Sequence, residues 1–364
     1  MNPPESRSQM LARADEAQVR DADLRAKLED KRGTAGYEFQ LMAMVSTQRT
    51  RDEQAAKAAA RRAELAGMSR EQRRRSIARE VIETEGPAAE NLRYMPTPLA
   101  ICGLPYKKLD TDGKEFIREQ GRMRIVVTPG SITDPNGKRI LQPIPYGPKA
   151  RLIMAHLSTE ALRNRSPVIE VAPSFTAFLR DLGFSRRGGE RGNIKPFKEQ
   201  LQALAACRME IAAWNGKQSA TVDVKPFSKM QLWFSDNPDQ QSLWTSTIQF
   251  SKDFFEQLQN HALPIDVRVL KALSNSARRL DLMMWVTYRI TRLDTKLVLD
   301  WGPLKGQFGE GYARDRDFRA ALVDDLAALK ELFPKLPVKL TERGLEMEAA
   351  DASALSIAKR LPRA

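Results

Sequence analysis

The sequence predicts an α+β protein whose N-terminal part is helical and whose remainder is built from two similar units. Residues 1–91 are rich in Ala, Arg, Glu and Gln and hold few large apolar side chains, which favours exposed helices. From Leu92 onward, short β-like segments alternate with amphipathic helices. The order helix, strand, helix, helix, hairpin then occurs twice, within residues 149–224 and within residues 266–348.

The composition points to an anionic partner. The chain has 364 residues, enough for two or three domains, and a net charge of +13. Such a charge most often serves nucleic acid, and an anionic membrane surface is the weaker alternative. No apolar run approaches the ~20 residues that a membrane span needs. Met1 to Asp30 lacks the apolar core of an export signal, and the two isolated cysteines fit a reducing compartment, so we expect a cytoplasmic protein.

Residues 1–91 are expected to form a helical, basic and partly flexible N-terminal arm. Helices are predicted over residues 52–65 and 70–85, and a Gly-Pro pair ends the region. Ten basic residues stand against four acidic ones between Arg49 and Arg79. This pattern fits a solvated helical face without a specific role as well as an arm that contacts phosphates or a partner protein.

Short β segments are expected before the first of the two similar units. Residues 116–119 and 123–128 flank a Gln-Gly-Arg turn, and Leu99–Leu104 is an apolar segment of the same section. The elements expected next are helices over 149–163, 174–182 and 193–208, a strand over 168–171, a hairpin with arms 209–214 and 219–224, strands over 230–234 and 246–250, and a helix over 252–260. Asn-Gly between the hairpin arms is a strong turn signal.

The second unit repeats this order. Its expected elements are helices over 266–273 and 276–293, a strand over 296–299, helices over 301–308 and 314–333, and a hairpin with arms 338–341 and 345–348. Helices of this number followed by a hairpin are typical of a winged helix, so we predict two winged-helix domains in tandem. Their expected bounds are residues 92–262, with a β-rich lead-in, and residues 263–350, followed by a C-terminal tail over 351–364.

The start of the helix expected over 193–208 carries the main functional signal. A basic, glycine-rich turn precedes it, and an apolar stripe follows at Leu201, Leu204 and Ala205. Such a helix directs a charged N-terminus into a polyanion, as a recognition helix does in the major groove of DNA. The candidate DNA contacts here are Arg186, Arg187, Arg191, Asn193, Lys195 and Lys198. Arg pairs with guanine and Lys neutralises phosphate, whereas Asn193 either reads adenine or caps the helix. The alternative is a solvated loop with accidental charge.

The helix expected over 314–333 offers a second candidate. Arg314, Arg316 and Arg319 lie near its start and alternate with two aspartates. Aspartates suit the positive end of the helix dipole but oppose phosphate, so a charge-balanced exposed helix start is the competing interpretation. The two hairpins would rest as wings on the DNA backbone through Lys217, Lys339 and Arg343.

The sequence holds no credible catalytic constellation, and we expect neither an enzyme nor a bound cofactor or metal. No segment matches the Gly-x-x-x-x-Gly-Lys-Ser/Thr loop that cradles nucleotide phosphates. The two histidines, His156 and His261, lie too far apart for the metal-binding pair of a DNA-nicking enzyme, and two distant cysteines exclude a zinc motif. His156 and the tryptophans are expected to be structural. A metal-dependent nuclease built on scattered carboxylates stays open as an alternative.

Three segments resemble the plasmid-encoded RepA replication initiator family. The first runs from Leu141 to Ala161 as LQPIPYGPKARLIMAHLSTEA. The others are Phe178–Gly183, with the basic glycine-rich segment after it, and Ala277–Leu282 at the start of a helix that bears Trp and Tyr. The likeness extends roughly from Leu92 to Met347 and leaves the N-terminal arm outside.

The resemblance implies a tandem winged-helix initiator that binds repeated sites, called iterons, in double-stranded DNA at a plasmid origin. Such proteins promote opening of the adjacent duplex and recruit the host DnaA protein and replicative helicase. Many also repress their own promoter, often as homodimers, and act at the origin as monomers. A plasmid transcriptional repressor with the same fold is therefore the alternative among DNA-binding proteins, and no membrane partner is expected.

Overall fold

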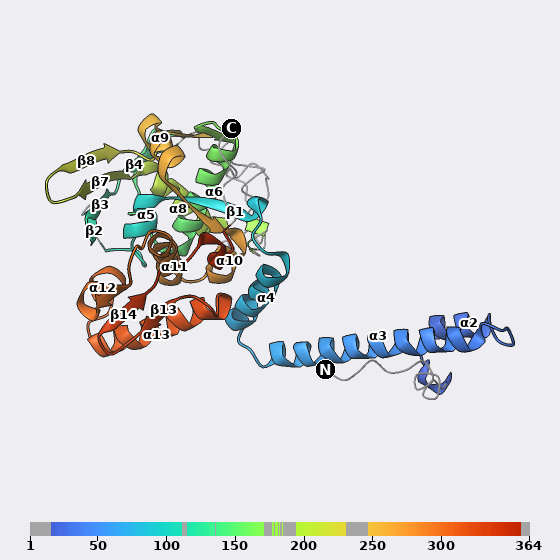
Figure 1. Cartoon of the computed structure of the whole chain (residues 1–364). Coiled ribbons are helices and arrows are strands. Elements are labelled where there is room, and N and C mark those ends of the chain that lie inside the picture. Colours follow the sequence, from blue (N-terminus) through green and yellow to red (C-terminus); the bar gives the residue numbers. More distant parts are fainter. Residues whose placement is uncertain are drawn as a thin grey trace. The chain divides into compact units, whose positions relative to one another are not determined.

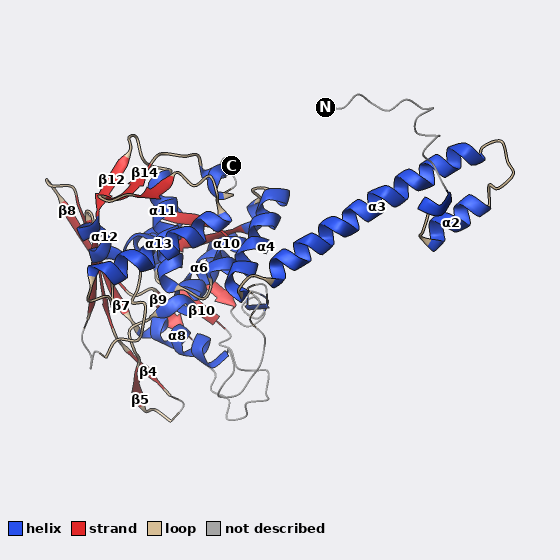
Figure 2. Ribbon diagram, turned by 90° about the horizontal axis from the view of Figure 1, so that it is seen from below, coloured by secondary structure: helices blue, strands red, loops and turns tan. Residues whose placement is uncertain are grey.

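The computed structural model has the mixed α+β composition that the sequence predicts (Figures 1 and 2). The residues that the structure describes are 16–110, 115–134, 136–170, 194–230 and 247–357, together with Ala177, Leu179, Arg180, Leu182 and Phe184. The chain divides into two compact units, Met1–Arg73 and Arg74–Ala364, and each is considered by itself. Within the described residues, no helix is both long and apolar enough to cross a membrane.

The compact unit Met1–Arg73 is a small helical assembly. Its elements are η1 (Glu16–Gln18), α2 (Ala22–Glu29) and α3 (Tyr37–Ala66). Their apolar contacts form a small core made of Val19, Leu24, Leu28 and Val45. The buried side chain of Gln48 in α3 accepts hydrogen bonds from the backbone amides of Arg20 and Asp21, at 3.0 and 2.9 Å. This contact fixes the start of α2 against α3.

Helix α4 (Arg70–Glu85) belongs mostly to the second unit, although the sequence places it in the arm. Its Arg75, Ala78 and Ile82 side chains are buried. The Arg75 guanidinium forms an ion pair with Glu331, with 2.6 Å between Nε and Oε2. At least one arginine of the basic run therefore stabilises the fold and is not available to a phosphate.

The elements of the first predicted domain lie close to their expected positions. They are η2 (Ala89–Asn91), β1 (Leu92–Pro96), α5 (Thr97–Cys102), β2 (Phe116–Gln120), β3 (Met123–Thr128), β4 (Ser131–Thr133), β5 (Arg139–Leu141), α6 (Gly147–Arg163), β6 (Val168–Glu170), α8 (Ile194–Ala206), β7 (Arg208–Trp214), β8 (Ser219–Val224), β9 (Phe227–Met230), β10 (Thr247–Phe250) and α9 (Lys252–His261). The helix expected over 174–182 lies largely outside the described residues.

Two segments of this domain differ from the expectation. Of the strand expected over 230–234, only Met230 falls in β9, and residues 231–234 lie outside the described residues. Leu99–Leu104, grouped with the short β segments, instead supplies most of helix α5. The proline at position 98 sits in the first turn of that helix, where its fixed φ angle favours a helix start. Gly103 then ends the helix at a φ of 72°.

The second predicted domain has the expected element order. Its elements are β11 (Ala262–Asp266), α10 (Val267–Leu273), α11 (Ala277–Ile290), β12 (Leu297–Asp300), α12 (Trp301–Phe308), α13 (Asp315–Leu332), β13 (Val338–Leu340), β14 (Gly344–Met347) and η3 (Ala352–Leu355). Ser276 caps α11 by accepting a hydrogen bond from the Arg279 amide, at 3.3 Å. Asp266 caps α10 in the same way through the amide of Arg268, at 2.8 Å.

The described strands form five small antiparallel sheets. Their strand orders are β2-β3-β7-β8, β6-β10-β9, β12-β14-β13, β1-β11 and β4-β5. The hairpin β7–β8 turns at Asn-Gly as expected, and Gly216 has a φ of 92°. This hairpin extends the sheet of β2 and β3, because β7 pairs with β3. Strand β6, which precedes the helices, pairs with β10 instead.

A single apolar core spans both predicted domains. It extends without a break from Ala78 of α4 to Ile357 near the end of the described chain. The largest fully buried side chains include Trp285 of α11, which packs edge-on against Phe308 of α12 at a centroid distance of 5.6 Å. Both cysteines are buried and unpaired, as expected, and His156 is also buried. The buried residues of the two predicted domains therefore form one shared core.

Candidate nucleic-acid interface

Helix α8 joins a charged start to a buried apolar stripe. Phe197, Leu201 and Leu204 are buried, and Phe197 meets Phe184 edge-on at a centroid distance of 5.1 Å. Lys195 in the first turn is exposed, and Lys198 is half-buried. Arg186, Arg187, Arg191 and Asn193 lie outside the described residues. The described part of α8 thus has the polarity expected of a helix that presents its N-terminus to an anion.

A hydrogen bond orients α8 on helix α6. The Gln200 side chain, which is buried, accepts a hydrogen bond of 2.8 Å from the Tyr146 amide at the start of α6. The Lys149 ammonium lies 5.8 Å from the Phe197 ring centroid, and burial lowers the pKa of this lysine. The starts of α6 and α8 are therefore held together by contacts that the apolar stripe does not provide.

Lys217 lies at the tip of the β7–β8 hairpin. The Asn215 side chain accepts hydrogen bonds from the backbone amides of Lys217 and Gln218, at 2.9 and 2.8 Å, which fixes the turn. The Lys217 side chain is exposed. The hairpin, and with it Lys217, belongs to the β2-β3-β7-β8 sheet. Helix α8 instead contacts β4 and β9, which belong to two other sheets.

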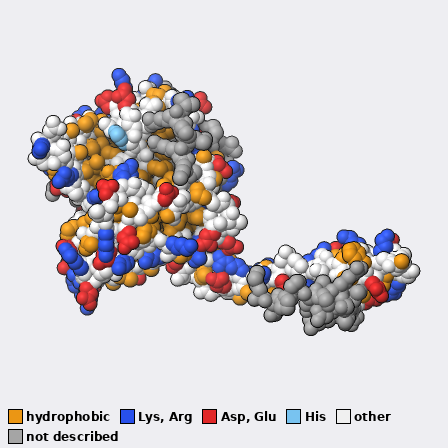
Figure 3. Space-filling view, viewed as in Figure 1, with side chains coloured by type: hydrophobic (Ala, Val, Ile, Leu, Met, Phe, Trp, Pro, Cys, Tyr) orange, Lys and Arg blue, Asp and Glu red, His pale blue; other side chains and the backbone are white. Residues whose placement is uncertain are grey.

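The arginines at the start of α13 all have local partners. Arg314 pairs with Asp317 at 2.7 Å, and Arg316 lies 3.6 Å from the same carboxylate. The Arg319 guanidinium lies 4.9 Å from the centroid of the Trp301 ring. Basic and acidic side chains mix over this part of the surface in Figure 3. The start of α13 is therefore charge-balanced, and Arg314, Arg316 and Arg319 are all exposed.

The second hairpin carries paired charges as well. Lys339 and Lys296 both contact Glu346, at 3.2 and 2.6 Å, and their hydrogen bonds lower the pKa of that carboxyl. Arg343 pairs with Asp300 at 2.9 Å between Nε and Oδ1 and remains exposed.

Trp301 connects this hairpin to α13. Its indole N–H donates a hydrogen bond of 2.9 Å to the carbonyl of Glu342, and the Arg319 guanidinium lies over its ring. The structure thus brings Arg319 and the turn that bears Arg343 onto one tryptophan. The sequence does not reveal this grouping, because the three residues lie in separate elements.

A set of four charges, the central cluster, is not predicted by the sequence; three of its side chains are buried and the fourth is partly exposed. It consists of Arg118 of β2, Arg151 of α6, Asp281 of α11 and Glu310 after α12. Arg151 and Asp281 form a bidentate pair, with 2.5 Å between Nε and Oδ1 and 2.6 Å between Nη2 and Oδ2. Their side chains are 3% and 4% exposed. Burial alone would lower the pKa of Arg151, but the charge and hydrogen bonds of Asp281 raise it above the ordinary value.

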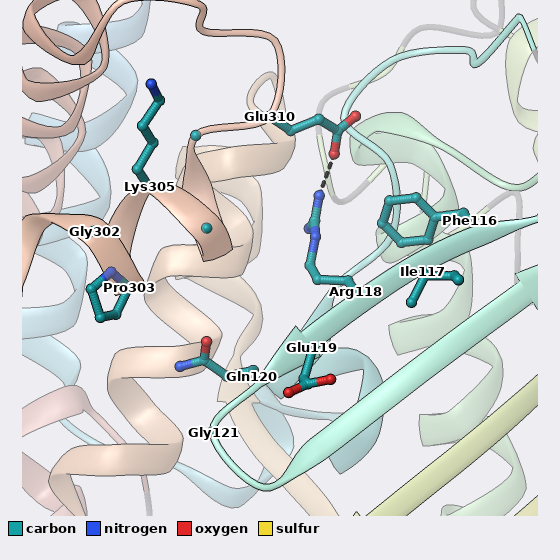
Figure 4. Close-up of a pocket in the computed structure, with 12 residues that line it drawn as sticks. Phe116, Ile117, Arg118, Glu119, Gln120, Gly121, Gly302, Pro303, Lys305 and Glu310 are labelled. Carbon is teal, nitrogen blue, oxygen red and sulfur yellow. Dashed lines mark hydrogen bonds and ion pairs between the residues drawn. The ribbon is translucent and has the colours of Figure 1, made fainter.

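The central cluster extends to the surface through Arg118. Its guanidinium lies 3.7 Å from Asp281 and pairs with Glu310 at the edge of an open pocket between β2 and α12 (Figure 4). Tyr106 lies against both arginines, at 4.8 Å from Arg118 and 5.5 Å from Arg151. A local signal was present in the sequence, because Arg151 interrupts the apolar face of a helix and a buried charge requires a partner.

The described residues contain no group of three or more His, Cys, Asp and Glu side chains that could hold a metal ion.

Comparison with known proteins gives one family match. Residues 144–301 match a family model, RepA_C, described as plasmid encoded RepA protein. Among solved structures, the chain is similar to the crystal structure of a selenomethionine derivative of domains 2 and 3 of RctB. That likeness has 12% sequence identity and a TM-score of 0.45, and it covers 70% of this chain and 98% of the other. No curated protein matches. The resemblance seen in the sequence is therefore confirmed over residues 144–301, the part of the chain that matches this family model.

Proposed function

We propose that this protein is a plasmid replication initiator that binds repeated origin sites in duplex DNA through two winged-helix domains. The observation that carries the proposal is a repeated topology. The sheets β6-β10-β9 and β12-β14-β13 have the same strand order. In each, a helix precedes the first strand, a further helix (α8 or α13) precedes the second, and the last strand lies in the middle.

This topology supports the following correspondence between the two proposed domains. Helix α13 comes directly before β13, whereas β7 and β8 lie between α8 and β9. With that hairpin set aside, α8 and α13 would take the place of recognition helices. In the first domain β9 and β10 would then correspond to β13 and β14. The hairpin β7–β8, which the sequence predicts as the wing, extends the sheet of β2 and β3 and would be an insertion in this scheme. Lys217 stays a candidate backbone contact from that insertion.

The charges support duplex DNA as the ligand. Lys195, Lys198 and the arginines before α8 would approach one groove, and Arg314, Arg316 and Arg319 would approach a second. The acidic partners of the second set do not prevent this. An exposed ion pair contributes about 0–1 kcal/mol, so a phosphate oxygen can replace an aspartate at little cost. Lys339 and Arg343 would contact the backbone beside α13.

The resemblance to the RepA family extends the proposal to origin activity. On this basis the protein binds iterons, promotes opening of the adjacent duplex, and recruits host DnaA and the replicative helicase. Binding as a homodimer to its own promoter would belong to the same scheme. A transcriptional repressor with the same fold and a metal-dependent nuclease are the alternatives.

The test is to footprint the purified protein on the DNA that flanks its gene. Protection of directly repeated sites next to an AT-rich tract, with loss of plasmid maintenance when the gene is deleted, supports the initiator. Protection of a promoter operator alone supports the repressor. Cleavage of duplex DNA that depends on Mg²⁺ supports the nuclease and contradicts the proposal. A shuffled sequence of the same composition serves as the control DNA.

A further inference from the structure

The central cluster joins the two predicted domains through helices α6 and α11. Arg151 lies on α6 and Asp281 lies on α11, 130 positions apart in the chain. The remaining N–H groups of Arg151 are also used. They donate hydrogen bonds to the carbonyls of Leu104, Pro105 and Gly147, at 2.5, 3.2 and 2.8 Å. The guanidinium is thus fixed in its plane by contacts on two sides.

A buried ion pair of this kind specifies geometry more than it stabilises the fold. Desolvation of both charges offsets much of their attraction, so apolar residues of similar size often hold a core equally well. The bidentate arrangement of guanidinium and carboxylate is directional, however, because two parallel hydrogen bonds fix rotation as well as distance. The pair therefore restrains how α6 and α11 are turned relative to each other.

Two members of the central cluster, Glu310 and Arg118, hold the turn that precedes α13. Glu310 lies between α12 and α13 and pairs with Arg118 of β2. Its other carboxylate oxygen accepts a hydrogen bond of 3.1 Å from the Tyr106 amide. In the same region, the buried Gln307 side chain donates a hydrogen bond of 3.2 Å to the Ile101 carbonyl. The turn that leads into α13 is therefore held against β2 and α5 (Figure 4).

Gly103 shows how closely the central cluster is packed. Its φ is +72°, and a Cβ atom placed on it would overlap the Asp281 carboxylate and lie 3.1 Å from Nη1 of Arg118. The backbone at the end of α5 therefore fits around the charges without room for a side chain.

We infer that the central cluster is a clasp that sets the angle between the two DNA-binding domains. It thereby fixes the number of base pairs between the two grooves that α8 and α13 enter. We treat the four members of the central cluster as positioning residues, because Arg118, Arg151 and Asp281 are buried and Glu310 is paired with Arg118, so that their charges are engaged within the protein. This inference rests on the proposed function.

The experiment measures binding as a function of spacing. The duplex probes carry the site protected by the wild-type protein, with one, two or three base pairs inserted between its two protected halves. One base pair rotates a half-site by roughly 34–36° about the helix axis, since a turn has 10–10.5 base pairs. For the wild type we expect each insertion to weaken binding at least tenfold. For Glu310→Gln and Arg151→Lys we expect the insertion penalty to fall at least threefold, with unchanged affinity for an isolated half-site.

Two controls separate positioning from simple loss of stability. Leu258→Ala removes a buried side chain of α9 outside the central cluster and should lower the melting temperature without changing the spacing profile. Glu310→Gln keeps the acceptor for the Tyr106 amide and lies at the partly exposed end, so it decides the question if Arg151→Lys does not fold. Folded variants with the wild-type spacing profile would overturn the clasp alone. A wild-type protein with no two-part footprint would overturn the proposed function itself.

Discussion

Replacement of Gly103 by alanine gives the most direct measure of how the central cluster constrains the fold. Gly103 has a φ of 72° and a ψ of −172°, a combination that side-chain-bearing residues rarely adopt. The added methyl would also occupy the position of the Asp281 carboxylate, whose Cγ atom would lie only 2.9 Å from the new Cβ. The carboxylate would have to leave its two arginine partners.

The expected cost follows from these two effects. The backbone conformation costs about 1–3 kcal/mol for a residue other than glycine. Separating a buried ion pair costs about 3–5 kcal/mol, because a charge is left without its partner in the interior. The sum is at least about 4 kcal/mol, a large share of the 5–15 kcal/mol that typically holds a protein folded. We therefore expect Gly103→Ala to unfold at far lower urea concentration than the wild type or not to fold at all.

Gly137→Ala is the matched control for this substitution. Gly137 has a similar φ of 80°, but no atom lies within 4 Å of the position that its Cβ would take. It therefore bears only the backbone cost, roughly 1–2 kcal/mol. Urea unfolding followed by circular dichroism measures both variants. Equal losses in the two would refute the steric conflict with Asp281 and the tight packing inferred for the central cluster.

Three further outcomes are expected. Replacing Arg187 and Arg191 by alanine should weaken specific binding by about 1–3 kcal/mol for each base contact, with an unchanged circular dichroism spectrum; unchanged affinity in a gel-shift titration would mean that the first recognition element is misplaced. Binding should fall about 10³-fold between 50 and 200 mM salt if six phosphates are neutralised, whereas a flat dependence would contradict a footprint that spans the duplex. Burial lowers the pKa of His156 to about 3, with smaller effects from Arg93 and Arg163. The unfolded chain then binds a proton that the folded protein refuses, so folding stability falls as pH drops below about 6.5. His156→Gln should remove up to about 1.4 kcal/mol per pH unit of that decline in urea unfolding between pH 6 and 4, and an equal slope in both proteins would count against the burial effect.

The sequence predicts the second domain closely because its signals are local. Helix α13 shows a clear apolar stripe, and the expected range 314–333 differs from the observed Asp315–Leu332 by one residue at each end. Helix α12 agrees at both ends. The sequence does not predict helix α5, because four of its six residues are apolar and consecutive. So short a run shows neither the 3.6-residue period of a helix nor the two-residue period of a strand, and only the Thr-Pro start favours a helix.

The pairing of strands could not be predicted from the same signals. The hairpin at 209–224 was found from its Asn-Gly turn, but nothing local states that β7 pairs with β3 rather than with the strand before the helices. Likewise β6 meets β10 across a gap of more than 70 residues. Such long-range choices depend on which apolar faces can be buried together, and a turn signal carries no information about this.

Burial divides the arginines of this basic protein into two roles. Arg75, Arg118, Arg151 and Arg268 are buried and each faces a carboxylate, so their charge is neutralised inside the fold. The excess positive charge must therefore be sought among the exposed residues, where a phosphate can compete with water and with weak ion pairs. Two of the segments that resemble the RepA family, LQPIPYGPKARLIMAHLSTEA and Ala277–Leu282, supply Arg151 and Asp281 and hence the two sides of one buried pair. These two segments therefore mark how the predicted domains are joined, while the surface proposed to read DNA lies at the helix starts of α8 and α13.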